Sequence, residues 1–381
     1  MNLLYYSKAL NASHGGRIHA RSFVQELSSD ARIDKVITVP KIKDEFSIGN
    51  NKSVHSAWKA LLPFRNVLAL LKVNLLCLHD VLRTIHRERP DVVICRVNAN
   101  FLQIPLLKWT YPDIPLAVEV NGSPFDEYMS ETAGGVFWSK LERYCLSYSD
   151  RNFFISDVLR KSMMGNHLDS TRDYVLYNGV DISLFRKQNK NTWPTKIKSE
   201  NNVITLGYVG SLVESKNVSQ LIKAVEELKD RGYAARLIVV GDGEVLDNLK
   251  ALSAELDLQG DIEFTGRVPH KEVPDQIARF DVAIHHYAEE YMCPLKLFEY
   301  MAVGVPVIGP DTVAVKEIFD HGVHLLLTNG EPVDIAERVI QVKRDNALSE
   351  RIATAGQDLV RTNFTWRDNT NKVVSQLKKL V

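Results

Sequence analysis

The amino-acid sequence predicts an α/β protein with two doubly wound domains. Short runs rich in β-branched residues alternate with longer segments of helical apolar spacing along the 381-residue chain. Repeated strand–helix–strand order is typical of parallel sheets covered by helices. A polar stretch with one proline, 186–202, separates two such sets and has the composition of a linker. At about 150 residues per domain the length also fits two domains.

Strands are predicted where apolar runs lie between turn residues. In the first set they are Asn2–Tyr6, Lys35–Val39, Asp91–Cys95, Leu116–Val120, Asn152–Ile155 and Tyr174–Leu176. In the second set they are Val203–Val209, Ala235–Val240, Ile262–Phe264, Val282–His285 and Val305–Ile308. Helices are predicted over Asn217–Lys229, which keeps one apolar face, and over the tail Phe364–Val381. We therefore expect domains over 1–190 and 191–363, and a C-terminal helix over 364–381 that could pack back on the first domain.

The charge balance excludes some classes of protein and conceals an asymmetry. The chain has 47 basic and 47 acidic residues and is 45% hydrophobic. A disordered chain would be poorer in apolar residues, and a nucleic-acid-binding chain would be more basic, so neither is expected. The first 190 residues nevertheless carry 25 Lys/Arg against 19 Asp/Glu, and the remaining 191 carry 22 against 28. A basic first half suits an anionic partner.

The expected location is the cytoplasm. The N-terminus has no basic segment followed by an apolar core, so a signal peptide is not expected. The most apolar stretch, Val67–Leu78, contains Lys72 and Asn74 and is far shorter than the ~20 residues of a membrane-spanning helix. The four cysteines are isolated, so neither a zinc site nor a disulfide framework is indicated. His285 and His286 lack partners at ligand spacing, and no metal is expected.

Two predicted strand-to-helix turns have features of anion sites. The glycine pair Gly15 and Gly16 follows the first strand and precedes a helix, which allows close approach of the backbone to an anion; a plain turn is an equal reading. In the second domain Gly210-Ser211 opens the turn that leads to Lys216 beside a helix start. The ammonium and the helix dipole could act on one phosphate, although a solvated surface lysine is the simpler alternative. The P-loop and G-x-G-x-x-G fingerprints are both absent.

A third candidate is the segment that follows the strand Val282–His285. Pro294 suits the first position of a helix. Lys296 and Glu299 are three residues apart among mostly apolar neighbours such as Leu295. An acid and a base on one helix in apolar surroundings indicate a lined cleft; the alternative is a surface ion pair.

The ordered series of these motifs resembles the family 4 retaining glycosyltransferases of the GT-B fold. The resemblance covers nearly the whole chain and is stronger in the second half. Its motifs are Gly15-Gly16, Tyr177-Asn178-Gly179-Val180-Asp181, Gly210…Lys216, Val239-Val240-Gly241-Asp242-Gly243, Phe264-Thr265-Gly266-Arg267-Val268, and Glu299-Tyr300-Met301-Ala302 leading into Gly304-Val305-Pro306-Val307-Ile308.

The resemblance implies two Rossmann-like domains that face each other across a cleft, the first binding an acceptor and the second a nucleotide-sugar donor. Lys216 would contact the donor diphosphate and Glu299 the ribose hydroxyls. Gly266, Arg267 and Val268 would lie against the base, and Gly15 and Gly16 would approach the diphosphate from the first domain. A UDP-sugar is the expected donor and a GDP-sugar the next, with no metal and no further cofactor. The expected reaction retains the anomeric configuration and needs no protein nucleophile.

The sequence also departs from the family's pattern. Ser211 stands where many relatives have a basic residue, so Lys216 lacks a second cationic helper at that position, and Lys296 is the candidate to replace it. The family's paired glutamates are eight residues apart, which places Tyr291 at the first position and Glu290 one residue out of register. Glu290 is still expected to reach the sugar through a loop adjustment, unless backbone fills that role.

The first domain has its own departure from the family's pattern. Many relatives have a histidine after the fourth or fifth strand, where this chain has Asn121. Asn121 is expected to hydrogen-bond the sugar or acceptor. Glu119 is the nearby carboxylate, with an acceptor role or a buried strand position as its two readings.

Residues 51–89 are a candidate membrane contact. They hold seven Lys/Arg against Asp80 and Glu88, interleaved with apolar residues. Such a segment could lie on an anionic membrane surface, or it could be an ordinary helix packed on the first sheet. The family commonly uses lipid-linked acceptors, which favours membrane contact and a glycan acceptor in polysaccharide or lipopolysaccharide synthesis. A nucleotide-sugar epimerase of the same fold and a non-catalytic two-domain ligand-binding protein are the alternatives.

Overall fold

The computed structural model describes residues 1–12, 15–42, 78–97, 101–122, 133–185 and 203–381. They form two compact units, one of Met1–Tyr177 with Asn369–Val381 and one of Asn178–Asp368. The predicted domain boundary at 190 lies outside the described residues, while the two units divide at Tyr177 and again within the last helix. Each unit is an α/β layer structure and is described by itself.

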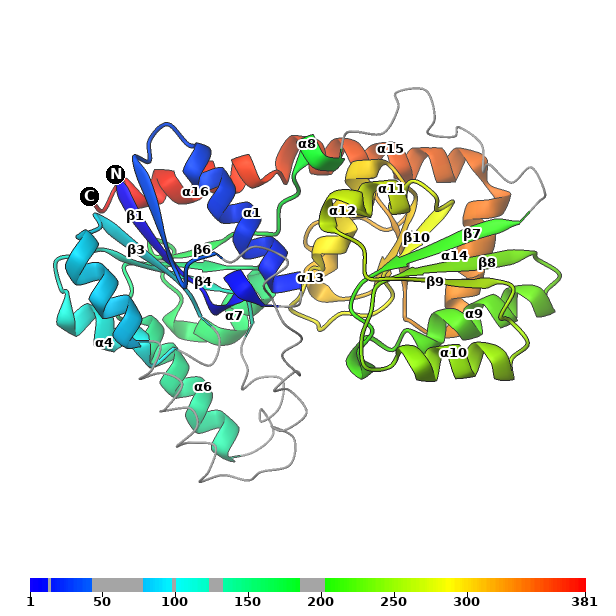
Figure 1. Ribbon diagram of the computed structural model, residues 1–381, viewed down its shortest axis with the longest axis horizontal. Coiled ribbons are helices and arrows are strands. Elements are labelled where there is room, and N and C mark those ends of the chain that lie inside the picture. The colour runs from blue at the N-terminus through cyan, green and yellow to red at the C-terminus, as the bar shows by residue number, and fades with distance from the viewer. Residues whose placement is uncertain (13–14, 43–77, 98–100, 123–132, 186–202) are drawn as a thin grey trace. The chain divides into compact units, whose positions relative to one another are not determined.

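The first unit contains a six-stranded parallel sheet in the order β2-β1-β3-β4-β5-β6. Its strands are β1 (Asn2–Tyr6), β2 (Lys35–Val39), β3 (Val92–Val97), β4 (Leu116–Val120), β5 (Arg151–Phe154) and β6 (Asp173–Val175). Helices α4 (Gln103–Thr110), α6 (Ala133–Leu146) and α7 (Asp157–Met164) lie below the sheet in Figure 1, and α1 (Gly15–Ser29) and α16 (Trp366–Leu377) lie above it. Every residue of β4 is buried, because helices cover both faces of such a sheet.

The second unit contains another six-stranded parallel sheet, in the order β12-β11-β10-β7-β8-β9. Its strands are β7 (Ile204–Val209), β8 (Ala235–Val240), β9 (Ile262–Gly266), β10 (Val282–Ile284), β11 (Val307–Pro310) and β12 (Leu326–Thr328). The larger helices are α9 (Ser219–Asp230), α10 (Leu246–Glu255), α12 (Leu295–Val303), α14 (Pro332–Arg344) and α15 (Asn346–Asn363). The shorter ones are α8 (Ile182–Phe185), α11 (Val273–Ile277) and α13 (Val313–Lys316).

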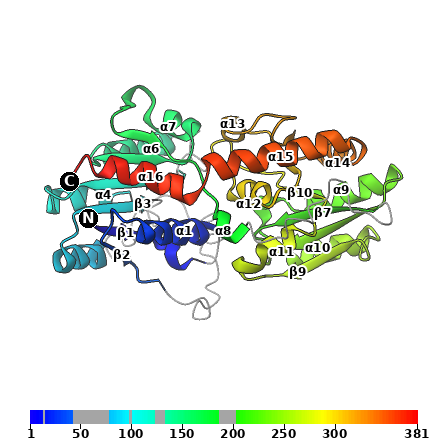
Figure 2. The same cartoon turned by 90° about the horizontal axis from the view of Figure 1, so that it is seen from above.

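Packing in the second unit follows from its sequence pattern. The predicted apolar face of α9 is buried, with Leu221, Ile222 and Val225 fully enclosed beside residues of α10 and α14. Helices α12 and α15 lie side by side, as Figure 2 shows. Strand order reverses between β7 and β10, so the loops after these two strands diverge there. In open α/β sheets this switch point, at the carboxyl ends of the strands, is where ligands bind.

The strand predictions are confirmed to within two residues at each end, and the last helix is found as α16. Strand β12 was missed, because its three residues are too few to show a periodicity. Within the described residues, no helix combines the length and the apolar character needed to cross a membrane.

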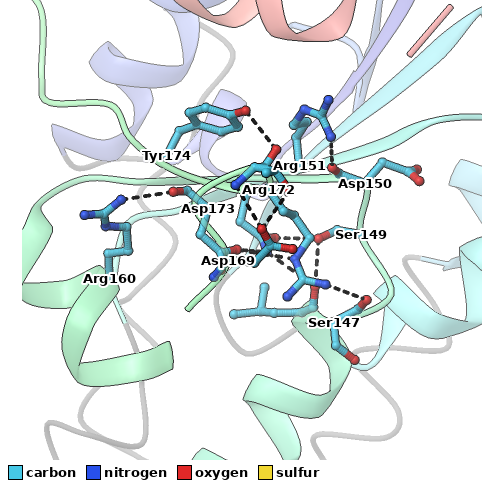
Figure 3. A network of polar contacts seen from close by, with 12 residues as sticks. Ser147, Ser149, Asp150, Arg151, Arg160, Asp169, Arg172, Asp173 and Tyr174 are labelled. Atoms are coloured by element: carbon cyan, nitrogen blue, oxygen red, sulfur yellow. Dashed lines mark hydrogen bonds and ion pairs between the residues drawn. The ribbon is translucent and has the colours of Figure 1, made fainter. Parts of the chain in front are cut away.

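A polar network ties together the amino ends of β5 and β6 (Figure 3). Asp173 is 1% exposed, and its two carboxylate oxygens accept hydrogen bonds from Asn152 Nδ2 at 2.8 Å and from the Asp169 backbone N–H at 2.9 Å. Ser149 Oγ donates to Asn152 Oδ1 at 2.6 Å. Arg172 Nε lies 3.5 Å from the Asp173 carboxylate. The buried carboxylate is therefore paired on both oxygens, at the edge of the sheet opposite the strand carboxyl ends.

We expect Asp173→Ala to lower the free energy of unfolding of the first unit by about 2–4 kcal/mol, because the Asn152 amide and the Asp169 N–H lose their buried acceptor. Urea unfolding followed by circular dichroism measures the change. Asp113→Ala, at an exposed site, is the matched control and should leave the midpoint unchanged. An unaltered midpoint for Asp173→Ala would show that the network contributes little.

Candidate functional site

The loops at the carboxyl edge of the second sheet are locked to one another by backbone hydrogen bonds. The Leu212 N–H donates to the Asp242 carbonyl at 3.1 Å, and the Val245 N–H donates back to the Leu212 carbonyl at 3.2 Å. These bonds join the loop after β7 to the loop after β8. The loop after β9 joins them, because the Gly241 N–H donates to the Gly266 carbonyl at 3.0 Å. A rigid backbone surface results at the switch-point edge.

Glycines make this close packing of loops possible. A Cβ on Gly241 would lie 1.9 Å from the Gly210 carbonyl oxygen, and one on Gly243 would lie 2.1 Å from the Leu212 carbonyl oxygen. Gly241 also has a φ of +153°, which disfavours other residues. The Gly241-Asp242-Gly243 segment fails the dinucleotide fingerprint and has this packing role instead.

Lys216 lies at the switch point. It ends a 3₁₀ turn, Glu214–Lys216, that comes shortly before α9, and it is half-buried. Its Nζ lies 5.9 Å from the centroid of the Tyr287 ring, and Tyr287 follows β10. The Lys216 ammonium therefore lies where the loops after β7 and β10 meet. Gly210 and Ser211 begin the same loop, directly after β7.

Glu299 on α12 is a buried carboxylate with partners on both oxygens. Its Oε2 accepts a hydrogen bond from Lys296 Nζ at 2.6 Å, and its Oε1 lies 3.1 Å from His270 Nε2. Glu299 is 1% exposed, so the predicted pair of Lys296 and Glu299 is not the surface ion pair of the alternative reading. Burial acts to raise the pKa of Glu299, but Lys296 and His270 outweigh it and the pKa is lowered. The carboxylate is therefore ionised.

The start of α12 differs by one residue from the prediction. Pro294 is the residue before the helix, with a φ of −63°, and Leu295 is the first helical residue. Leu297, Phe298 and Tyr300 are fully buried, which seats α12 firmly in the unit. This packing fixes where Lys296 and Glu299 project.

Two buried histidines, His285 and His286, directly follow β10. His285 stacks on Tyr208, with ring centroids 5.9 Å apart and planes 11° apart. Its pKa is well below the ordinary value, first because of burial and then because of the neighbouring Lys216, His286 and Lys296. Burial also lowers the pKa of His286 to about 4, and its Nε2 hydrogen-bonds the Asn217 carbonyl at 3.0 Å. The charges of Lys216 and Lys296 therefore both act on His285, whose imidazole is neutral. The switch-point edge around these residues is electropositive.

The other residues expected to bind the donor lie at the same edge of the sheet. Gly266 ends β9 with a φ of +71°, Arg267 is exposed and Val268 is half-buried. Glu290 is exposed, and its Oε2 accepts a hydrogen bond from the Val313 N–H at 3.0 Å, at the start of α13. That contact holds the loop after β10 against α13. Within the described residues, no group of three His, Cys, Asp or Glu side chains is arranged to hold a metal ion.

In the first unit, Glu119 is the centre of a buried cluster at the carboxyl ends of the strands. Tyr5 Oη donates to its Oε2 at 2.8 Å, while Arg96 at 3.2 Å and the Asn121 amide at 3.1 Å donate to its Oε1. His19 Nε2 contacts the same oxygen. Burial acts to raise the pKa of Glu119, but His19 and Arg96 outweigh it and lower the pKa overall. Glu119 is 4% exposed, and the side chain of Asn121 is half-buried. The hydrogen bond from the Asn121 amide to Glu119 therefore orients Asn121.

Four residues of the Glu119 and Glu299 clusters were missed by the sequence reasoning: Tyr5, His19, Arg96 and His270. A glutamate inside the apolar run Leu116–Val120 signals a buried cationic partner. The sequence does not show which cation that is, since His19 is 100 positions away. His270 is similarly 29 positions from Glu299.

Two further expectations fall partly outside the described residues. Helix α1 begins at Gly15, and Gly16 is half-buried, while residues 13–14 before them are not described. Of the candidate membrane segment 51–89, residues 51–77 also lie outside the described part. Residues 78–88 are helical, with Val81 and Ile85 buried and Arg83 and Arg87 exposed. This described part has the pattern of an ordinary helix packed in the first unit.

Comparison with known proteins gives a match to a family model and several named relatives. A family model described as "Glycosyl transferases group 1" matches residues 189–359, somewhat less than half of the chain. A GDP-mannose-dependent alpha-mannosyltransferase of Mycobacterium tuberculosis is 26% identical over 68% of this chain and 64% of its own length. A capsular polysaccharide biosynthesis glycosyltransferase, CapM of Staphylococcus aureus, is 22% identical over 80% of each chain. Other glycosyltransferase relatives match over only about half of their own length.

Among solved structures, Anabaena Alr3699/HepE in complex with UDP-glucose is similar over 100% of both chains, with a TM-score of 0.74 and 18% sequence identity. Likeness at this level of identity shows the fold. The chain therefore has the GT-B fold of two Rossmann-like domains, and the family model and the named relatives support a glycosyltransferase.

Proposed function

We propose that this protein is a retaining, metal-independent glycosyltransferase that moves a sugar from a nucleotide-sugar donor to a hydroxyl of a glycan acceptor. The observation that carries the proposal is the arrangement at the switch point of the second unit. There, the charges of Lys216 and Lys296 both act on the buried His285, and Lys296 is paired with the buried Glu299. The loops after β7 and β8 pack closely through Gly241 and Gly243 at the same edge of the sheet. The arrangement offers positive charge for a diphosphate and a fixed carboxylate for hydroxyl groups.

The donor is bound by the second unit in this proposal. Glu299 accepts hydrogen bonds from the ribose hydroxyls, and Lys216 contacts the diphosphate. Gly266, Arg267 and Val268 lie against the base. A UDP-sugar is the first choice, because the similar HepE structure contains UDP-glucose. A GDP-sugar is the second, because a named relative depends on GDP-mannose.

The chemistry follows from where charge develops. Breaking the sugar–phosphate bond places negative charge on the departing diphosphate, and the Lys216 ammonium and backbone N–H groups stabilise it. The acceptor hydroxyl attacks from the face that the nucleotide leaves, which retains the configuration without a protein nucleophile. The departing phosphate takes the hydroxyl proton. The Lys216 ammonium supplies positive charge that a divalent ion would otherwise provide.

The acceptor is bound by the first unit in this proposal. Asn121, oriented by Glu119, hydrogen-bonds the sugar or the acceptor, and Glu290 reaches the sugar when its loop adjusts. The relative CapM acts in capsular polysaccharide biosynthesis, which supports a cell-surface glycan precursor as the acceptor class. We place this acceptor on a lipid carrier at the cytoplasmic face of the membrane, which the excess of basic residues in the first half of the chain favours.

A donor screen with the full chain tests the proposal. Thermal unfolding is measured with UDP-, GDP-, ADP- and dTDP-sugars; at one hundred times its Kd the matching donor stabilises the folded state by about 2.7 kcal/mol. Turnover of that donor is then followed by NMR with a lipid-linked glycan acceptor and with EDTA present. A product with retained anomeric configuration is expected. Epimerised donor without any acceptor would indicate an epimerase, and binding without turnover under all conditions would indicate a ligand-binding protein.

A further inference from the structure

We infer that His270 is a positioning residue that orients Glu299 for the vicinal hydroxyls of the donor's ribose. The inference rests on the proposed function and goes beyond it, because it gives a role to a side chain outside the motifs of the resemblance. His270 itself contacts the carboxylate and not the nucleotide. It therefore determines how well the ribose is recognised.

The geometry places two restraints on one carboxylate. Lys296 lies one turn before Glu299 on α12, and its Nζ binds Oε2 at 2.6 Å. His270 comes from a different element, the 3₁₀ turn His270–Glu272 that follows β9, and its Nε2 lies 3.1 Å from Oε1. The Glu299 carboxylate is ionised and accepts only, so the His270 ring donates Nε2–H. One donor would leave the carboxylate able to turn about its last side-chain bond, which has broad preferences. Two donors from separate elements fix its plane.

His270 is itself held in place by packing. Its ring meets the edge of Phe185 at a centroid distance of 5.7 Å and an angle of 61°. Phe185 ends α8 and is 2% exposed, so it offers a fixed surface. The His270 side chain is 23% exposed and the Glu299 side chain 2% exposed. The imidazole therefore lies between the buried carboxylate and the outside of the unit.

The lone pairs that remain suit two adjacent hydroxyls. Each carboxylate oxygen has about two acceptor positions, and His270 and Lys296 occupy one on each oxygen. One position per oxygen is left in a fixed plane, which matches the paired hydroxyls of a ribose. Without His270 the Glu299 carboxylate can rotate, and its hydrogen bond to the second ribose hydroxyl no longer adds to the affinity. The effect should appear in recognition of the ribose and leave the diphosphate contacts intact.

Isothermal titration calorimetry on the full chain tests the inference, using whichever of UDP or GDP the wild type binds and its 2′-deoxy analogue. The wild type should bind the ribonucleotide about 10-fold or more tightly than the deoxy analogue, since a carboxylate hydrogen bond is lost with the hydroxyl. His270→Leu should abolish this ratio by weakening the ribonucleotide alone. His270→Gln, which keeps an N–H donor, should restore most of it. Lys271→Ala, on the same turn but exposed, is the matched control and should bind like the wild type.

A double variant separates positioning from a merely structural role. If His270 acts through Glu299, His270→Leu added to Glu299→Gln should cause no further loss of ribonucleotide affinity. The inference is overturned if the wild type and His270→Leu prefer the ribonucleotide over its 2′-deoxy analogue by the same factor. It is also overturned if His270→Gln binds the ribonucleotide as weakly as His270→Leu does. A wild type that binds no nucleotide would overturn the proposed function, and this inference with it. Circular dichroism confirms that each variant is folded.

Discussion

Lys216→Ala should lower kcat for sugar transfer by about 10²–10³-fold, the usual cost of removing one group that stabilises a developing oxyanion. Lys216 is a cation at the point where the loops after β7 and β10 meet, and its Nζ lies 5.9 Å from the centroid of the exposed Tyr287 ring. Because the ammonium is half-buried in loops and not in the core, its loss should change the free energy of unfolding little. The expected result is an inactive, folded protein.

Lys296 is not placed to take over this role. Its Nζ binds Glu299 at 2.6 Å, and its side chain is 16% exposed. If Lys296 moved to the diphosphate, it would leave a buried carboxylate with one partner fewer, which is costly. We therefore expect the deficit of Lys216→Ala to be large even though a second lysine is near.

Two variants sharpen the Lys216 experiment. Lys223→Ala removes an exposed lysine of α9 and is the matched control for charge and domain. Lys216→Arg keeps the charge but changes its shape and should keep part of the activity. Initial rates with saturating donor and acceptor are measured for all three. If Lys216→Ala turned over donor as fast as Lys223→Ala does, Lys216 would have no catalytic role.

Local spacing explains which parts of the fold could be predicted. Strands such as Asn2–Tyr6 and Ala235–Val240 are continuous apolar runs between turn residues, and the structure has them at the predicted positions. Lys296 and Glu299 are one helical turn apart, so their contact could be anticipated from their spacing. Their burial could also be anticipated from the apolar residues around them.

Contacts between distant segments could not be predicted in the same way. His270 reaches Glu299 because the sheet brings the end of β9 close to α12. The sequence does not show that these two segments, 29 positions apart, come into contact. His19 and Arg96 reach Glu119 from α1 and β3 for the same reason. The contact of Glu290 with the start of α13 depends on how a loop turns, which spacing does not determine. The sequence thus predicted Glu299, Glu119 and Glu290 as candidate site residues, whereas the topology of the fold determines which side chains and backbone groups they contact.

Glu119→Ala should destabilise the first unit by about 3–5 kcal/mol, the range for removing one partner of a buried ion pair. The change leaves His19 and Arg96 in the interior without their carboxylate, and the buried hydroxyl of Tyr5 without its acceptor. Glu119→Gln keeps the volume and one oxygen, so its loss should be smaller. Urea unfolding followed by circular dichroism gives both values, with Asp113→Asn at an exposed site as the matched control.

The same carboxylate should make the first unit sensitive to acid. The pKa of Glu119 in the folded protein lies below its ordinary value of 4.5, because His19 and Arg96 outweigh the effect of burial. A carboxylate with a lowered pKa binds its proton more readily in the unfolded chain. Its contribution to stability is therefore complete above about pH 4.5 and is lost as the pH falls further towards the pKa of the folded state. Between pH 6 and pH 3 the wild type should lose more stability than Glu119→Gln, which has no such proton to bind. Parallel pH dependences for the two proteins would show that the ion-paired carboxylate does not control the response to acid.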